Sequence, residues 1–247
     1  MENQSTPMRR RYTQVNPRVF ANYEHPRCCV PGCLRRPHHF GAVRCGRHES
    51  RATAYGDARA SAVTEGDLRP YFDYIAQGLS WFHATPALHE AERRTEYLLH
   101  YTPTEDAEWS RWLAGRMTAA RCKRGRSRIT PFDVLIRVLA FYALQEAHPE
   151  RVPSITSHRI LLARVVGRLG PSGGRRVRIG KHGLIRAGEF IAELYGPFPT
   201  AFLAQLRKRW VRERTRKERG TRLLADFGSA VEIGATNTSE TNHDGTH

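Results

Sequence analysis

Lysine is scarce in this sequence of 247 residues, and long apolar runs and a disulfide-rich cysteine content are missing. Only four of its 40 basic residues are Lys, and the other 36 are Arg. No run of 18 apolar residues occurs, so we expect no transmembrane helix and no membrane partner. The first residues lack the apolar core of a signal peptide, and five Cys are too few for a disulfide scaffold. We therefore expect a protein of the bacterial cytoplasm or nucleoid.

Acidic residues are also scarce, and their distribution is uneven. The 24 acidic residues leave a formal net charge of +16, with an isoelectric point near 10.4. Residues 1–62, 111–186 and 187–225 carry +7, +14 and +5, whereas residues 63–110 and 226–247 carry −6 and −4. An excess of positive charge favours a polyanionic partner. We expect that partner to be a nucleic acid, DNA rather than RNA.

Composition and periodicity divide the chain into four regions and predict a mainly α fold. Residues 1–26 read as a basic flexible arm, and residues 27–62 as a small zinc-binding module. Residues 63–227 show the apolar spacing of amphipathic helices, with a sub-boundary near 102–130. Residues 228–247 are rich in Thr, Asn, Ser and Gly, which is typical of a disordered tail.

Helix starts are predicted at three capping boxes, in which a Thr side chain and a carboxylate three residues later satisfy backbone amides. These boxes pair Thr64 with Asp67, Thr102 with Glu105, and Thr130 with Asp133. Pro86 predicts a further start, because proline suits the first helical position. Apolar spacing predicts later helices over about 157–169, 187–195 and 200–224.

A basic β-hairpin is predicted between the helix over 157–169 and the helix over 187–195. Residues 175–179 alternate Arg with apolar side chains, and residues 180–183 have the composition of a turn. Residues 184–186 can form the returning strand. Together with helices over 131–147 and 157–169, this hairpin is compatible with a winged helix-turn-helix. In that arrangement the polar start of the second helix approaches DNA with Ser154, Thr156, Ser157, His158 and Arg159. A helical bundle carrying a basic surface hairpin is the alternative.

A metal site is predicted near the N-terminus. Cys28, Cys33, Cys45 and His48 follow the spacing C-x4-C-x11-C-x2-H, which supplies two close ligand pairs joined by a loop. Four such ligands suit a tetrahedral Zn²⁺ ion and leave no open position, so we expect a structural site. Two alternatives compete at the level of sequence. Cys29 can replace Cys28, and His38 or His39 can replace His48. Free thiols with surface histidines are the interpretation without a metal, which the paired spacing disfavours.

The same segment resembles a small zinc motif of bacteriophage and bacterial DNA-processing proteins, often found beside HNH-type endonuclease modules. The resemblance rests on Cys28-x4-Cys33 with Gly32, on Cys45-x2-His48, and on Arg51 and Gly56-Asp57. It implies the four ligands named above and a setting in a phage, plasmid or transposon-like element. Glu49 stands where the motif usually has an aromatic residue, no Pro follows Asp57, and no His-Asn-His core follows. The resemblance therefore implies zinc and mobile DNA rather than cleavage.

The residues expected to contact nucleic acid are cations, with one histidine, in five segments of the chain. They are Arg9, Arg10 and Arg11; Arg121, Lys123, Arg124, Arg126 and Arg128; His158 and Arg159; Arg175, Arg176, Arg178 and Lys181; and Arg207, Lys208, Arg209, Arg212 and Arg216.

The function expected from these features is that of a zinc-stabilised, non-catalytic DNA-binding protein. It would act as a regulator or accessory factor in replication or recombination, within a larger protein–DNA complex. No catalytic set is recognised in the sequence, which makes an enzyme the weaker expectation. A divergent nuclease or recombinase is one alternative, and an RNA-binding ribonucleoprotein assembly factor is the other.

Overall fold

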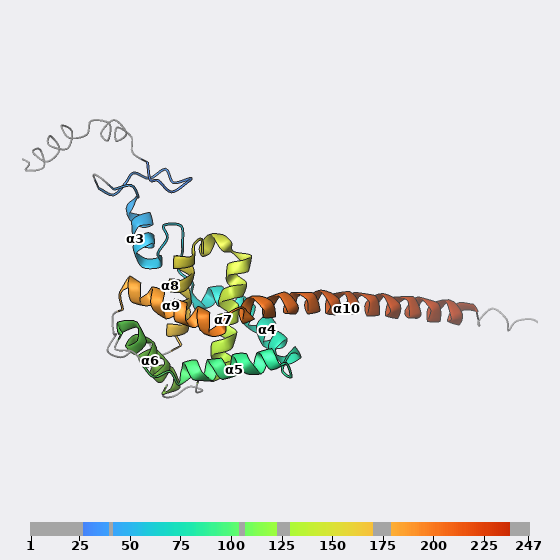
Figure 1. Cartoon of the computed structure of the whole chain (residues 1–247). Helices are drawn as coiled ribbons and strands as arrows, with labels where there is room; N and C mark the ends of the chain where they lie inside the picture. Colours follow the sequence, from blue (N-terminus) through green and yellow to red (C-terminus); the bar gives the residue numbers. More distant parts are fainter. Residues whose placement is uncertain (1–26, 40–41, 104–106, 123–128, 170–178, 238–247) are drawn as a thin grey trace, which may run out of the picture. The chain divides into compact units, whose positions relative to one another are not determined.

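Residues 27–39, 42–103, 107–122, 129–169 and 179–237 are described by the structure, which is a computed structural model. Within these ranges the chain forms eight α-helices, one short 3-10 helix and no strand (Figure 1). It divides into two compact units, residues 1–196 and residues 197–247. The helices of the first unit are α3 (Gly46–Tyr55), α4 (Glu65–Trp81), α5 (Pro86–Leu99), α6 (Glu108–Arg121), α7 (Pro131–Ala147), η1 (Pro149–Arg151), α8 (Ile155–Gly167) and α9 (Lys181–Tyr195).

Capping residues set the starts of α4 and α7, as predicted. Asp67 accepts a hydrogen bond from the Thr64 amide at 2.7 Å, and Asp133 accepts one from the Thr130 amide at 2.8 Å. Both capping boxes are complete in the structure. The helix start predicted at Thr102 is wrong, because α6 begins at Glu108 after Ala107, while Glu105 lies outside the described residues.

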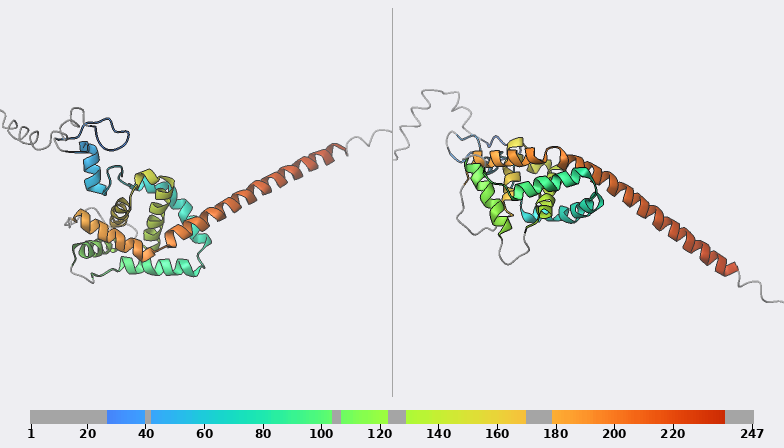
Figure 2. Two further views of the ribbon diagram at one scale, coloured as in Figure 1. Left: turned by 45° about the horizontal axis from the view of Figure 1, so that its top comes forward. Right: turned by 60° about the horizontal axis from the view of Figure 1, so that its bottom comes forward.

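The core of the first unit forms where α7 packs against α4, α5 and α8, and where α8 packs against α9. Both α7 and α8 are buried on more than one face, with Leu135, Leu139 and Phe141 fully enclosed. The crossing of α8 and α9 is close enough that Gly188 has room only for hydrogen beside the carbonyl of Arg159. Figure 2 shows the same helices from two further directions.

The predicted basic β-hairpin over residues 175–186 is wrong in its second half. Residues from Lys181 onward belong to α9, and residues 170–178 lie outside the described part of the chain. The physical reason is the spacing of Leu184, Ala187, Ile191 and Tyr195, which recur every three or four residues and bury one helical face. The wing of a winged helix-turn-helix is therefore not seen.

The second unit consists of one long helix, α10 (Phe198–Asn237). It contains the helix predicted over 200–224 and continues through residues 228–237, where an irregular tail is predicted. Residues 1–26 and 238–247 lie outside the described ranges. No helix in the described part of the chain combines the length and apolar character needed to cross a bilayer.

Candidate metal centre

Three thiols and one imidazole converge near the start of the described chain. The ligand atoms of Cys28, Cys33, Cys45 and His48 all lie within 4.8 Å of one another. The Cys28 Sγ atom is 3.1 Å from His48 Nδ1, the Cys45 Sγ atom is 3.4 Å from the same nitrogen, and the Cys33 and Cys45 sulfur atoms are 3.9 Å apart. The four residues singled out by spacing are thus close enough to bind one metal ion.

The competing ligands lie outside this group. Cys29 is exposed, and its amide donates to the Val43 carbonyl at 2.8 Å, whereas Cys28 is buried. The His38 and His39 rings contact each other edge to face. His38 Nδ1 lies 3.2 Å from the Arg44 carbonyl, to which it can donate. The geometry therefore selects Cys28 over Cys29, and His48 over the two earlier histidines.

The first ligand pair is held by a tight reversal of the backbone. Gly32 has a φ of +76°, a left-handed conformation that strains residues with a side chain. The amide of Cys33 donates to the Val30 carbonyl at 3.1 Å, and the amide of Cys28 donates to the Arg35 carbonyl at 2.9 Å. These bonds bring the Cys28 and Cys33 sulfurs to the same side of the loop.

The second ligand pair is supplied by the first turn of α3. Cys45 is the N-cap of this helix, and its carbonyl accepts a hydrogen bond from the Glu49 amide at 2.9 Å. His48 follows within the first turn, so its ring returns toward the same end.

The thiols respond differently to their surroundings. Burial raises the pKa of Cys28, but hydrogen bonds from the backbone of Cys45 and Val30 outweigh it, so the pKa falls to about 6. A backbone hydrogen bond at Arg35 lowers the pKa of Cys33, but burial and the neighbouring Cys45 and Cys28 sulfurs raise it overall. A thiol that coordinates a metal ion is deprotonated, and the charge of a bound cation would offset the repulsion between neighbouring thiolates.

The segment after the metal-binding residues is anchored to the helical core by two arginines. Arg151 donates from one guanidinium nitrogen to the Ala62 carbonyl at 2.7 Å and from another to the Asp67 carboxylate at 2.8 Å. Arg168 donates to the Val63 carbonyl. Because both arginines bind backbone carbonyls, they fix the course of the connection rather than only its charge.

Helix α3 itself packs on α8. Gly56 ends α3 with a φ of +80°, and a Cβ atom there would lie 2.6 Å from Thr156 and 3.0 Å from Ile160. The Arg164 guanidinium lies over the Tyr55 ring, 5.1 Å from its centre. The helix that carries His48 therefore packs directly on α8, and Thr156 serves this packing.

His158 faces the protein core, which corrects its predicted place on a DNA-contacting surface. It is 7% exposed, and its Nδ1 lies 2.7 Å from the Gln145 side-chain oxygen. The Phe141 and Tyr142 rings lie 5.2 Å from the imidazole centre. Burial, with a smaller contribution from the Arg159 charge, lowers the pKa of His158 to about 4. A neutral, enclosed imidazole cannot reach a phosphate.

The remaining predicted contact residues fall into three groups. Arg159 forms an ion pair with Glu189 at 2.8 Å, and Arg121 contacts the Thr118 hydroxyl at 3.5 Å. On α10, Arg209 is half-buried and four cations are exposed, namely Arg207, Lys208, Arg212 and Arg216. The others lie outside the described residues: Arg9, Arg10, Arg11, Lys123, Arg124, Arg126, Arg128, Arg175, Arg176 and Arg178.

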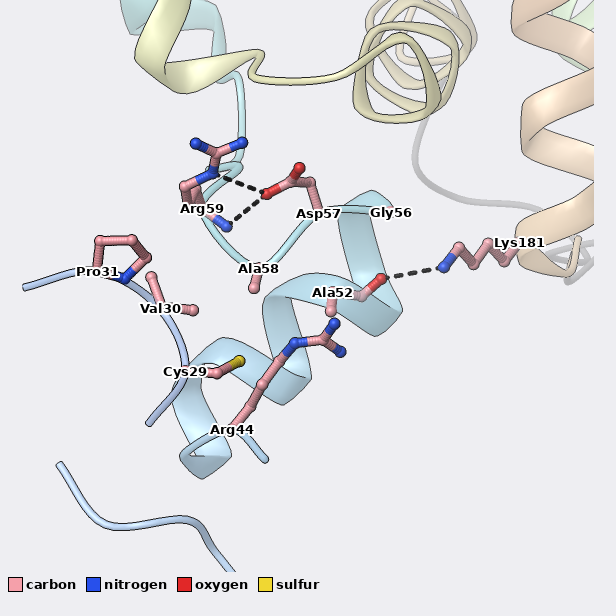
Figure 3. A pocket seen from close by; sticks show the side chains of 10 residues that line it. All are labelled: Cys29, Val30, Pro31, Arg44, Ala52, Gly56, Asp57, Ala58, Arg59 and Lys181. Carbon is pink, nitrogen blue, oxygen red and sulfur yellow. Dashed lines mark hydrogen bonds and ion pairs between the residues drawn. The ribbon is translucent and has the colours of Figure 1, made fainter. Parts of the chain in front are cut away.

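A pocket of about 360 Å³ lies beside the metal-binding residues (Figure 3). It is lined by residues 29–31, by Arg44 and part of α3, by residues 56–59 and by Lys181. Lys181 donates to the Ala52 carbonyl at 3.2 Å. Sequence reasoning identified Lys181 as a candidate contact but missed Arg44 and Arg59, because three segments far apart in the chain form this pocket.

Comparison with known proteins gives no match to this chain among protein families, curated proteins or solved structures. The metal-binding arrangement is therefore established by its own geometry. Nothing beyond the motif connects it with endonuclease-associated proteins.

Proposed function

We propose that this chain is a zinc-stabilised basic protein that binds nucleic acid, with duplex DNA preferred over RNA. Its role is that of a non-catalytic regulator or accessory factor in replication or recombination, in a phage, plasmid or transposon-like setting. The observation that carries the proposal is a row of exposed cations on α10, seen together with the four-ligand metal centre of the first unit.

Zinc is the metal that the ligand set favours. Three sulfurs and one imidazole nitrogen are ligands of intermediate to soft character, which suit a tetrahedral Zn²⁺ ion and not Mg²⁺ or Ca²⁺. Four protein ligands fill that tetrahedron. The ion would therefore stabilise the fold of the N-terminal segment and would offer no coordination position to a substrate.

The cation row on α10 comprises Lys208, Arg212 and Arg216, and we call it the α10 row. These residues are four apart, so they lie on one face of the helix at intervals of about 6 Å. All three are exposed, and within the described part of the chain no carboxylate forms an ion pair with them. By contrast, Arg214 pairs with Glu218 at 2.9 Å. Evenly spaced cations of this kind suit the repeating phosphates of a nucleic acid.

The preference for DNA rests on the motif. Phosphate contacts alone do not distinguish DNA from RNA. The Cys28–His48 segment resembles a motif of DNA-processing proteins, and this resemblance favours duplex DNA as the partner. Stronger binding to an RNA hairpin than to duplex DNA would instead identify an RNA-binding protein.

The experiment that tests the proposal compares two double variants of the zinc-loaded full chain. Lys208→Gln with Arg212→Gln removes two charges from the α10 row. Arg69→Gln with Arg93→Gln is the matched control, because it removes two exposed charges from residues 63–110, which carry a net charge of −6. Binding to a fluorescent duplex should weaken roughly tenfold or more in the first variant, and its salt slope should fall by about two. Equal binding by both variants would contradict a contact through α10.

A further inference from the structure

The pocket beside the metal-binding loop brings together positive side chains from three parts of the chain. Arg44 precedes α3, Arg59 follows it, and Lys181 is the first residue of α9. In Figure 3 the Arg44 side chain runs along α3, while Lys181 reaches the same helix from α9. The metal-binding loop contributes Cys29, Val30 and Pro31 to the opposite wall.

Positive charge is in excess in this pocket. Among the described residues that line it, Asp57 is the one acidic residue, and it accepts a hydrogen bond from the Arg59 amide at 2.8 Å and lies 3.5 Å from the Arg59 guanidinium. That carboxylate is therefore already compensated within its own turn. Lys181 has no acidic partner among the described residues, and Arg44, which forms an ion pair with Glu49 at 3.4 Å, is the second cation that an anion in the pocket would meet.

Both cations retain unused hydrogen-bond donors. The ammonium group of Lys181 has three N–H donors, and one of them donates to the Ala52 carbonyl. The other two can donate to a bound anion. One nitrogen of Arg44 contacts Glu49 at 3.4 Å, and the fork of its guanidinium has five N–H groups in total. Lys181 also begins α9, and Gly180 before it supplies no side-chain cap, so the positive end of that helix adds to the field.

The volume and the mixed lining indicate what kind of anion fits. About 360 Å³ holds a phosphate with an adjoining sugar, and an isolated chloride would leave most of it empty. Val30, Pro31 and Ala58 give one wall an apolar surface suited to a sugar ring. Cys29, which lines the pocket, is exposed to solvent.

We propose that this pocket binds one phosphate group of a nucleic-acid strand, held by Arg44 and Lys181. The proposal rests on the proposed function and assigns it a second contact, separate from the α10 row. It also gives the metal centre a definite task. By shaping the Cys28–Cys33 loop and placing Cys45 at the start of α3, the metal would fix both the wall that faces Lys181 and the position of Arg44.

Single substitutions test the assignment in the zinc-loaded full chain. Lys181→Gln and Arg44→Gln should each weaken duplex binding roughly three- to tenfold, whatever the DNA sequence, and lower the salt slope by about one. Lys181→Arg should restore most of the loss. Arg69→Gln removes an exposed charge far from the pocket in sequence and should behave as wild type. Metal content and thermal melting of each variant show that folding is retained.

A readout at the pocket itself separates this proposal from the general one. In a Cys122→Ser background, Cys29 is the exposed thiol of the described residues, and iodoacetamide modifies it at a rate measurable by peptide mass mapping. A short duplex should slow that modification at least fivefold, and inorganic phosphate should do so only at far higher concentration. The same duplex should not protect Cys29 when Lys181→Gln is present.

Each outcome is decisive. If wild type binds DNA with a steep salt slope while Cys29 stays unprotected and the Lys181 and Arg44 variants match Arg69→Gln, the pocket assignment fails and the proposed function stands. Protection by inorganic phosphate without protection by DNA shows an anion site of another kind and overturns the strand assignment. Absence of any nucleic-acid binding by wild type overturns both.

Discussion

A guanidinium nitrogen of Arg151 lies 2.8 Å from the carboxylate of Asp67, the same carboxylate that completes the capping box of α4. Arg151 also holds the Ala62 carbonyl. One ion pair therefore joins the start of α4 to the segment that follows the metal-binding residues. The N-terminal segment and the helical core of the first unit depend on each other for stability through this pair.

Replacing Asp67 by Asn should cost about 2–3 kcal/mol of unfolding free energy, because both the charged hydrogen bond to Arg151 and part of the cap are lost. The matched control is Asp133→Asn, which weakens the cap of α7, where no arginine among the described residues is paired with the carboxylate, and should cost about 1 kcal/mol. Urea denaturation of both variants measures the difference. Equal losses would contradict a stabilising role for the Arg151 pair.

The same ion pair gives a defined acid dependence. The hydrogen bond from Arg151 holds the pKa of Asp67 well below its ordinary value, despite partial burial. A depressed carboxyl pKa stabilises the fold above the unfolded pKa, near 4, and this contribution is lost as the pH falls below it. Between pH 4 and pH 2.5 the wild type should therefore lose more stability than Asp67→Asn. Parallel pH profiles would show that Asp67 contributes nothing there.

Removal of the metal should unfold the N-terminal segment that carries the four ligands. We expect one zinc per chain, lost in Cys28→Ser and retained in Cys29→Ser, because the first sulfur lies in the ligand group and the second lies outside it. Elemental analysis of the purified variants gives the stoichiometry. Zinc retained in Cys28→Ser but absent from Cys29→Ser would reverse the ligand assignment.

The close crossing of α8 and α9 predicts opposite effects for two glycine substitutions. Gly188→Ala places a methyl group against the Arg159 carbonyl and should destabilise the protein by at least about 3 kcal/mol. Gly115→Ala lies on the exposed side of α6 with open space around it, and should stabilise by up to about 1 kcal/mol. Thermal melting distinguishes them, and a neutral Gly188→Ala would contradict the crossing.

Buried His158 should contribute to stability in a separate pH window. Its pKa of about 4 lies below the ordinary value of 6.5 because burial disfavours the imidazolium form. This contribution is present above pH 6.5 and declines as the pH falls toward 4, by at most about 3 kcal/mol. His158→Gln should flatten the wild-type pH dependence of unfolding in that window, whereas His182→Gln, at an exposed position, should not. An unchanged slope in His158→Gln would contradict the enclosed site.

Local signals predicted much of this fold, because caps and spacing act within a few residues. The boxes at Thr64 and Thr130 mark true helix starts, and the ligand set follows from two close pairs. At Thr102 the same two-residue signal does not mark a helix start. A capping pair is a weak preference, and α6 begins instead at Glu108, with Ala107 as its N-cap.

The errors and omissions arise where distant packing decides. The returning strand predicted over 184–186 is wrong, because the face carrying Leu184 and Ile191 belongs to a helix that packs on α8. His158 stands three and four residues before Leu161 and Leu162, so its place on an apolar stripe was visible in the sequence. The pocket around Lys181 had no such signal, since only folding brings its walls together.

The most direct test of the central claim is the binding of zinc-loaded wild type to labelled duplex DNA across a salt series, with an RNA hairpin as competitor. We expect the logarithm of the affinity to fall linearly with the logarithm of the salt concentration, with a slope of magnitude about four or more, and RNA to compete poorly. Weak binding with a shallow slope would contradict a nucleic-acid role. Preferential displacement by the hairpin would contradict DNA as the partner.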